Sequence, residues 1–140
     1  MSLLEIKDVN ISYHTPTKTV YAVQDVSLNV EEEDSVGIVG ESGSGKSTLA
    51  MGILRLLPEN ITEIEGQAVL NGKDLLSLSR KELNEVRWVD ISVVFQKAMN
   101  ALSPVHRIGE QMEDIYHVHF PNTPKAEVKK RIYELLKMVN

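Results

Sequence analysis

A glycine-rich stretch of the sequence, GESGSGKST at residues 40–48, holds the side chains best suited to chemistry. Gly40, Gly45, Lys46 and Ser47 follow the spacing G-x-x-x-x-G-K-S, a pattern whose backbone can cradle phosphate groups. Glycine allows backbone angles that other residues resist, and it lets the main chain approach an anion closely. Lys46 would bring a positive charge to the β- and γ-phosphates of a nucleotide, and the Ser47 hydroxyl is a hard oxygen ligand suited to Mg²⁺.

The backbone of this loop is also expected to bind an anion. Successive N–H groups from Ser42 through Gly43 and Ser44 to Thr48 would point into one nest, at the positive end of the helix that follows. The alternative is a glycine-rich turn that precedes a helix by chance. At ordinary amino-acid usage the pattern would arise by chance in about one chain of this length in two hundred, which favours the phosphate-binding interpretation.

The residues on both sides of the loop predict the elements that must position it. Residues 36–40, VGIVG, form a continuous apolar run, typical of a strand that is buried on both faces in a parallel sheet. Residues 46–57 are apolar nearly all round, which predicts an interior helix that ends at Pro58. A second apolar run, ISVVF at residues 91–95, predicts another buried strand. A strand, a loop and a helix in this order are the context in which the pattern binds phosphate.

Ahead of the loop, the sequence predicts antiparallel strands. Residues 3–13 are rich in branched side chains, and their alternation with polar residues slips by one at Lys7, which predicts a bulge. Residues 14–22 are typical of a hairpin tip, and residues 26–30 alternate as a half-buried strand should. Beyond the loop, a further short strand is predicted at residues 66–72.

The second half of the chain predicts mainly helices. Ser79 and Glu82 have the spacing of a capping box, for a helix that runs to about Val86. Residues 103–116 begin with Ser-Pro and place apolar residues at helical spacing. Residues 123–139 begin with Thr-Pro and carry an apolar stripe, which predicts a final helix with Thr123 as its cap.

Composition limits the classes of function. A chain of 140 residues has room for one domain, and its net charge of −5 argues against a nucleic-acid partner bound through a broad basic face. No apolar run approaches the roughly 20 residues that span a bilayer, so contact with a membrane would go through a partner. The chain has no cysteine, which excludes thiolate metal sites. His117 and His119 lack a carboxylate-rich surrounding and are expected to be solvated or capping side chains.

Four stretches of the chain, taken together, are similar to one family: ISY, YAVQDVSLNV, GESGSGKST and ISVVFQKAMNALSPV. Between Tyr13 and Gln96 the sequence resembles the ATP-binding subunits of ABC transporters, and FQKAMNALSPVHRIGEQ resembles their oligopeptide, dipeptide and nickel import group. The resemblance implies an α/β fold, a P-loop NTPase of the ABC ATPase type. It implies an antiparallel β part at residues 1–35, a nucleotide-binding core at residues 36–96, and the Q-loop with the start of a helical subdomain at residues 97–140.

The resemblance also implies roles for individual residues. Tyr13 matches the aromatic residue that stacks on adenine, whereas its residue type alone favours a ring packed on the sheet. Val23 would lie near the ribose or base. Gln96 would reach Mg²⁺ or the attacking water and would act in catalysis together with Lys46. Residues 97–109 would contact a membrane-spanning partner.

For the intact protein the resemblance implies ATP hydrolysis with Mg²⁺, coupled to import of peptides or a related small solute. The partners implied are transmembrane permease subunits and a second ATP-binding subunit, at the cytoplasmic face of the cell membrane. The family's LSGGQ signature and its apolar strand ending in Asp-Glu do not occur before Asn140. The chain is therefore expected to be a truncated N-terminal fragment that binds ATP or ADP and hydrolyses ATP negligibly. Its unpaired strand edges are expected to cause either self-association or a rearrangement of the sheet.

One departure from the family concerns the turn before the phosphate loop. The family usually has Gly there and this chain has Glu33, so the turn is expected to be strained or built differently. Two other classes of function remain as alternatives. They are an ABC-type ATPase without a membrane partner and a small P-loop kinase, although such kinases place the loop nearer the N-terminus.

Overall fold

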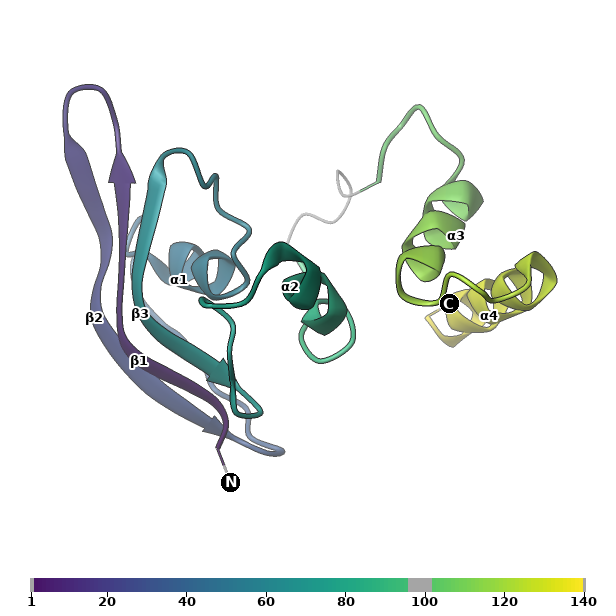
Figure 1. Ribbon diagram of the computed structural model, residues 1–140, viewed down its shortest axis with the longest axis horizontal. Helices are drawn as coiled ribbons and strands as arrows, with labels where there is room; N and C mark the ends of the chain where they lie inside the picture. The colour runs from purple at the N-terminus through teal and green to yellow at the C-terminus, as the bar shows by residue number, and fades with distance from the viewer. Residues whose placement is uncertain (1, 96–101, 140) are drawn as a thin grey trace. The chain divides into compact units, whose positions relative to one another are not determined.

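The computed structural model describes residues 2–95 and 102–139 (Figure 1). The chain forms two compact units, residues 1–87 and residues 88–140, each with its own internal contacts. The first unit holds the sheet, the phosphate loop and two helices, and the second holds a pair of helices.

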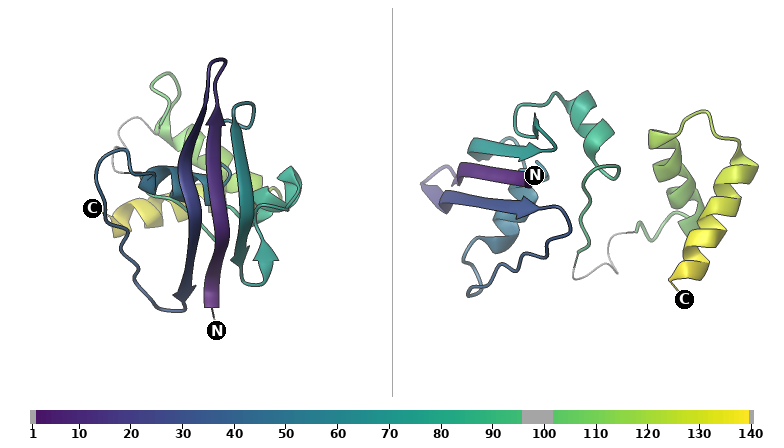
Figure 2. Two further views of the ribbon diagram at one scale, coloured as in Figure 1. Left: turned by 90° about the vertical axis from the view of Figure 1, so that its left-hand side faces the viewer. Right: turned by 90° about the horizontal axis from the view of Figure 1, so that it is seen from below.

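The first unit is built on an antiparallel sheet of four strands. The strands are β1 (Ser2–His14), β2 (Thr19–Glu31), β3 (Thr62–Leu70) and β4 (Lys73–Asp74). Their order in the sheet is β2-β1-β3-β4, and the three long strands lie side by side in the left view of Figure 2. The sheet confirms the predicted antiparallel part, but the hairpin tip is shorter than the predicted residues 14–22, because His14 pairs with Thr19 and β2 begins at Thr19. It also shows that β3 begins four residues earlier than predicted.

A bulge interrupts the pairing of β1 with both neighbours at the place where the sequence predicted one. The register shifts between Ile6 and Val9, and Asp8 has a positive φ of 49°. The Ser27 hydroxyl accepts a hydrogen bond from the Asp8 backbone N–H at 2.9 Å, so a side chain replaces a lost ladder bond. On the other side, a Cβ at Gly66 would lie 2.6 Å from the Asp8 carbonyl oxygen, so this position of β3 requires glycine.

Helix α1 (Lys46–Ile53) follows the phosphate loop and packs on one face of the sheet (Figure 2). Its contact with β1 is close, because a Cβ at Gly52 would lie 2.4 Å from the Ile11 side chain. The prediction that this helix runs to Leu57 is wrong. Arg55 adopts a left-handed φ of 51°, and the N–H groups of Arg55 and Leu56 bond to the carbonyls of Gly52 and Met51 at 2.8 and 2.9 Å. This is a Schellman ending, with arginine where glycine is usual.

Helix α2 (Arg80–Val86) begins with the capping box that the sequence predicted. The Ser79 hydroxyl accepts from the Glu82 N–H at 3.4 Å, and the Glu82 carboxylate accepts from the Ser79 N–H at 2.9 Å. Leu83 and Val86 are buried, so the helix is held by one apolar face and a capped first turn.

The two apolar runs that were predicted to be buried strands are not strands. Residues 36–40 have no regular structure, and Val39 is 96% exposed. Among residues 91–95 only Ile91 forms an isolated bridge, residues 92–95 have no regular structure, and Val94 is 92% exposed. A parallel strand needs hydrogen-bonded neighbours, and every strand pair in the described part of the chain is antiparallel and confined to β1–β4. These runs have the composition of parallel strands, but the described part of the chain forms no parallel sheet for them to join.

The second unit contains α3 (Ile108–His119) and α4 (Lys125–Met138), which confirm the two helices predicted for this region. Val128 and Ile132 of α4 are buried, whereas the C-terminal end of the predicted stripe is exposed. Pro124 caps α4, one residue later than predicted. Within the residues that the structure describes, no helix is long and apolar enough to span a membrane.

Candidate functional site

The phosphate loop lies between β2 and α1 and turns on two glycines with positive φ. Gly43 has φ 84° and Gly45 has φ 91°, and both values lie in the left-handed region that favours glycine. The Ser44 N–H donates to the Glu41 carbonyl at 3.3 Å, and the Leu49 N–H donates to the Gly45 carbonyl at 2.8 Å. The loop is thus a turn that passes directly into the first turn of α1.

Gly45 is required for two reasons, its positive φ angle and its close approach to the sheet. A Cβ on Gly45 would lie 2.3 Å from the Ala22 carbonyl oxygen and 3.4 Å from Cγ2 of Val23. Both neighbours belong to β2, so this strand fixes where α1 begins. Gly40 is less constrained, because the nearest atom to its Cβ would be the hydroxyl of the flexible Ser44 side chain, at 2.8 Å.

Lys46 lies across the loop. Its Nζ donates to the Gly40 carbonyl at 2.8 Å, to the Glu41 carbonyl at 2.5 Å and to the Ser44 hydroxyl at 3.1 Å. The ammonium group is therefore held by the same residues that form the predicted cradle. An anion bound in the loop would meet a full positive charge that is already in position.

The N-terminal end of α1 adds a partial positive charge to the same place. No acidic residue lies in its first turn, and no side chain caps it. Ser47 is exposed and Thr48 is half-buried in this turn. The unpaired N–H groups and the helix dipole therefore remain available to an anion.

A pocket of about 390 Å³ opens beside the loop. Its wall on β2 is largely apolar and includes Val23, which is 6% exposed. The pocket also includes Gly40, Ser44, Gly45 and Lys46, so the structure brings these predicted site residues together with Val23. Sequence reasoning missed the other residues of the wall, namely Ala22, Gln24, Val26, Leu28, Ile38, Val39 and Leu49. The alternation of apolar residues along β2 was the signal that could have found part of this wall.

Five of the predicted site residues that the structure describes do not line this pocket: Tyr13, and Ser42, Gly43, Ser47 and Thr48 of the loop and the first turn of α1. Tyr13 is half-buried near the end of β1, where it pairs with Val20 and Thr62, and it does not line the pocket. Gln96 lies outside the described residues.

Histidines and acids of the described residues form no cluster of three or more that could hold a metal ion. His14 is instead part of the sheet surface, where its Nε2 lies 2.8 Å from the Glu63 carboxylate. His117 and His119 lie in the last turn of α3, the end at which a positive charge would interact favourably with the helix dipole.

A glycine-rich loop against a strand, with a lysine across it and a helix behind it, defines a P-loop nucleotide-binding protein. Residues 23–140 match the family model described as ABC transporter, so the chain belongs to that family. This confirms the predicted fold class.

Curated relatives specify the branch of the family. The chain is 39% identical over 138 residues to the oligopeptide transport ATP-binding protein OppD of Escherichia coli, covering 99% of this chain and 40% of that protein. It is 36% identical over 137 residues to the dipeptide transport ATP-binding protein DppD of Lactococcus lactis, covering 98% of this chain and 39% of that one. The chain thus spans about two fifths of the length of these relatives.

Solved structures agree with the fold. The ATP-binding cassette MJ0796, described as dimeric and bound to ADP and Pi, matches with a TM-score of 0.75 and 29% identity over 96% of this chain and 56% of that one. The cassette cbiO1 of Clostridium perfringens, part of the transporter complex cbiONQ, matches with a TM-score of 0.64 and 24% identity. It covers 97% of this chain and 49% of that chain, and shows the fold alone.

Proposed function

We propose that this chain is the nucleotide-binding part of an ATPase subunit that powers ABC-type import of peptides or a related small solute. The observation that carries the proposal is the position of Lys46 Nζ, within 2.5–3.1 Å of acceptors from Gly40, Glu41 and Ser44. The names of the relatives, which are oligopeptide and dipeptide transport proteins, support the class of solute.

The loop residues fit the phosphate groups of a nucleoside triphosphate. A Cβ at Gly45 would collide with β2, so the backbone here is shaped for close approach, and no side chain competes for the first turn of α1. Phosphate oxygens would accept hydrogen bonds from the N–H groups of Ser42, Gly43, Gly45, Lys46, Ser47 and Thr48. The Ser44 N–H and the Lys46 ammonium would donate to phosphate in place of their present acceptors within the loop. The Ser47 hydroxyl would bind Mg²⁺, which neutralises phosphate charge when it is bound with the nucleotide.

Val23 and Tyr13 are proposed to contact the ribose and base. Val23 is supported by its place in the pocket beside the loop. Tyr13 rests on the family resemblance, since it lies outside the lining of that pocket. Gln96 is proposed to reach Mg²⁺ or the attacking water, on the same ground.

The partners and place of action follow from the same proposal. The intact protein would pair with a second ATP-binding subunit and with permease subunits at the cytoplasmic face of the membrane. Residues 1–140 would bind ATP and hydrolyse it negligibly, because they do not include the LSGGQ signature or the apolar strand ending in Asp-Glu. Such positioning and charge-stabilising groups supply nearly all of the rate in phosphoryl transfer.

Isothermal titration calorimetry of Mg-ATP tests the proposal directly. We expect saturable binding to the chain, a loss of at least tenfold in affinity for Lys46→Ala, and no change for Lys18→Ala. Lys18 is the matched control, since it is an exposed lysine at the hairpin tip between β1 and β2. Equal titrations for the two variants, or no binding at all, would contradict the assignment of the loop.

A further inference from the structure

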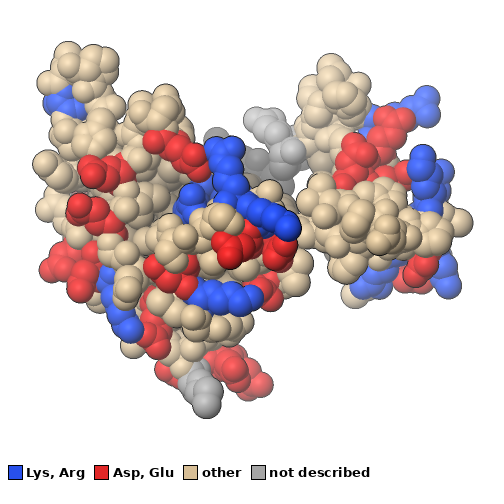
Figure 3. Space-filling model, in the orientation of Figure 1, with Lys and Arg blue, Asp and Glu red and all other residues tan. Residues whose placement is uncertain are grey.

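Beyond the C-terminal end of α1, three arginines from different segments line one pocket. Arg55 follows α1, Arg80 begins α2 and Arg87 follows α2, and the pocket that they share has a volume of about 650 Å³. Figure 3 shows basic and acidic side chains interleaved over the part of the surface where α2 lies. The charged residues of the pocket lining are these three arginines and Glu59.

Arg87 is fixed by backbone acceptors. Its Nε and Nη2 donate to the Leu54 carbonyl at 3.1 and 2.6 Å, and Nη2 also donates to the Arg55 carbonyl at 2.9 Å. Its Nη1 has no hydrogen-bond partner within the described part of the chain. Partial burial, with the neighbouring charge of Arg55, lowers the pKa of Arg87, but a guanidinium remains charged at neutral pH. Arg87 therefore lines the pocket with a guanidinium that two of its nitrogens hold in place.

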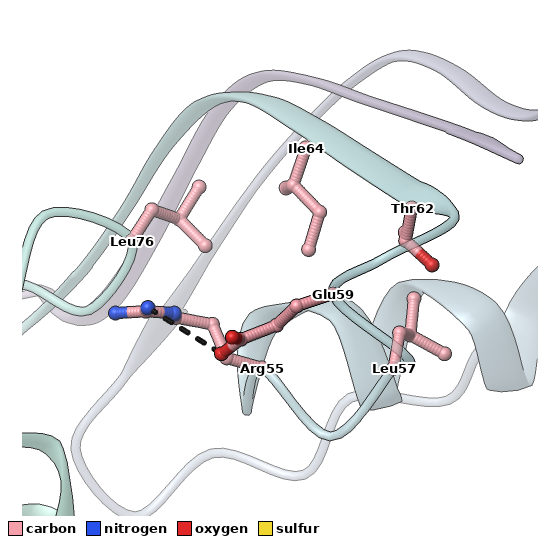
Figure 4. Close-up of a pocket in the computed structure, with 6 residues that line it drawn as sticks. All are labelled: Arg55, Leu57, Glu59, Thr62, Ile64 and Leu76. Carbon is pink, nitrogen blue, oxygen red and sulfur yellow. Dashed lines mark ion pairs between the residues drawn. The ribbon is translucent and has the colours of Figure 1, made fainter. Parts of the chain in front are cut away.

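Arg55 and Arg80 share a single acid. Arg80 Nη2 lies 2.9 Å from one carboxylate oxygen of Glu59, and Arg55 Nη2 lies 3.9 Å from the other (Figure 4). The hydrogen bond from Arg80 holds the pKa of Glu59 below its ordinary value, so this carboxylate is ionised at neutral pH. Three guanidinium groups against one carboxylate leave the pocket with two positive charges.

These features specify the chemistry of a ligand. Two excess positive charges suit a dianion, and the planar fork of a guanidinium matches the oxygens of a phosphate group. The same pocket has apolar walls from Leu56 and Leu83 and an amide from Asn84, which suit an organic group attached to that phosphate.

A smaller pocket of about 160 Å³ adjoins the first and shares Arg55, Leu57 and Glu59 with it (Figure 4). Thr62 lines this pocket, and its Oγ1 is buried with no hydrogen-bond partner in the described part of the chain. A buried hydroxyl without a partner costs free energy. A hydroxyl on the ligand that entered this pocket would supply the partner.

We propose that Arg55, Arg80 and Arg87 form a second anion site that binds a small phosphomonoester, with Glu59 as its internal competitor. Phosphate oxygens take the place of the Glu59 carboxylate on Arg80 and accept from the free Nη1 of Arg87. The site is separate from the phosphate loop, because the loop precedes α1 and Arg55 follows it. At about 1.5 Å per residue, the helix places roughly 12 Å between the two sites.

The experiment is a calorimetric titration of glycerol 3-phosphate into the Lys46→Ala variant, which lacks the cation of the phosphate loop. On this background we expect saturable binding that Arg80→Gln weakens at least about tenfold, because a charge-assisted contact is lost. Lys81→Gln, the adjacent exposed cation on α2, is the control and should not change the affinity. Glu59→Gln should tighten binding several-fold, since the competing carboxylate is neutralised.

Three results would overturn the proposal: no binding to the Lys46→Ala chain, equal effects of Arg80→Gln and Lys81→Gln, or unchanged affinity in Glu59→Gln. Unfolding does not confuse the comparison, because the Arg80 side chain is 81% exposed and its loss removes no packing. Circular dichroism melting curves of all four variants check this point. A failure here leaves the phosphate-loop assignment intact, because Mg-ATP binding to the unmodified chain is measured separately.

Discussion

Gly45→Ala places a methyl group where β2 already lies, and its cost can be worked out from the structure. The new Cβ would lie 2.3 Å from the Ala22 carbonyl oxygen, a backbone atom that cannot swing away. The φ of 91° adds about 1–2 kcal/mol for a residue with a side chain. Overpacking against the strand adds about 1–3 kcal/mol. The expected loss is therefore about 2–5 kcal/mol, a large part of the roughly 5–15 kcal/mol that stabilises a typical domain.

Urea denaturation followed by circular dichroism measures this loss, and two other glycines serve as matched controls. Gly43 and Gly72 have φ of 84° and 79°, and a Cβ at either would meet nothing within 4 Å. Gly43→Ala and Gly72→Ala should therefore each lower the free energy of unfolding only by the cost of the positive φ angle, about 1–2 kcal/mol. The reasoning would be refuted if Gly45→Ala cost no more than these controls, because the contact with Ala22 would then carry no energy.

Three further predictions concern the turn before the phosphate loop, the cap of α2 and an exposed apolar residue, all in the first unit. Glu33→Gly should raise the free energy of unfolding by about 1 kcal/mol, because Glu33 has a φ of 65°; an unchanged urea midpoint would show that the turn is unstrained. Ser79→Ala should raise the pKa of Glu82 toward its ordinary value, because the hydrogen bond from the Ser79 hydroxyl is the largest cause that lowers it; carboxylate NMR titration measures the shift. The pKa of Glu82 is lower in the folded chain than in the unfolded chain, so its ionised carboxylate stabilises the fold at pH values above the unfolded pKa. This stability is lost as the pH falls through the folded pKa. Ser79→Ala should therefore lose less stability on acidification than the parent chain. Val39→Ser should reduce concentration-dependent association, measured by light scattering, without loss of stability, because Val39 is 96% exposed. Association equal to that of the parent chain would show that another surface is responsible.

Features set by neighbouring residues could be predicted from the sequence. The capping box of α2 and the positive-φ glycines of the phosphate loop each depend on residue types within a few positions of one another. Local chemistry is sufficient for these, because a cap or a turn is satisfied by its own segment.

Features set by distant partners could not be predicted. The apolar run at residues 36–40 has the composition of a buried parallel strand, but a strand exists only where another strand accepts its hydrogen bonds. The early end of α1 has a similar origin. Arg55 leaves the helix where its guanidinium donates to the Leu78 carbonyl at 2.5 Å. This acceptor lies 23 residues further along the chain, so residues 46–57 alone do not indicate it.

The candidate site divides in the same way. The loop glycines and Lys46 were identified from their spacing, whereas the apolar wall of the adjoining pocket depends on which face of β2 meets the loop. Val23 was reached only through the family resemblance. The same resemblance supplied Tyr13, which the structure leaves outside the pocket lining.

Helix α1 is anchored at both of its ends by other parts of the first unit. At one end Gly45 abuts the Ala22 carbonyl, and at the other Arg87 binds the Leu54 and Arg55 carbonyls. The helix thus links the two pockets physically: its first residue follows the phosphate loop, and the carbonyls at its last turn hold the guanidinium of Arg87 in the arginine pocket.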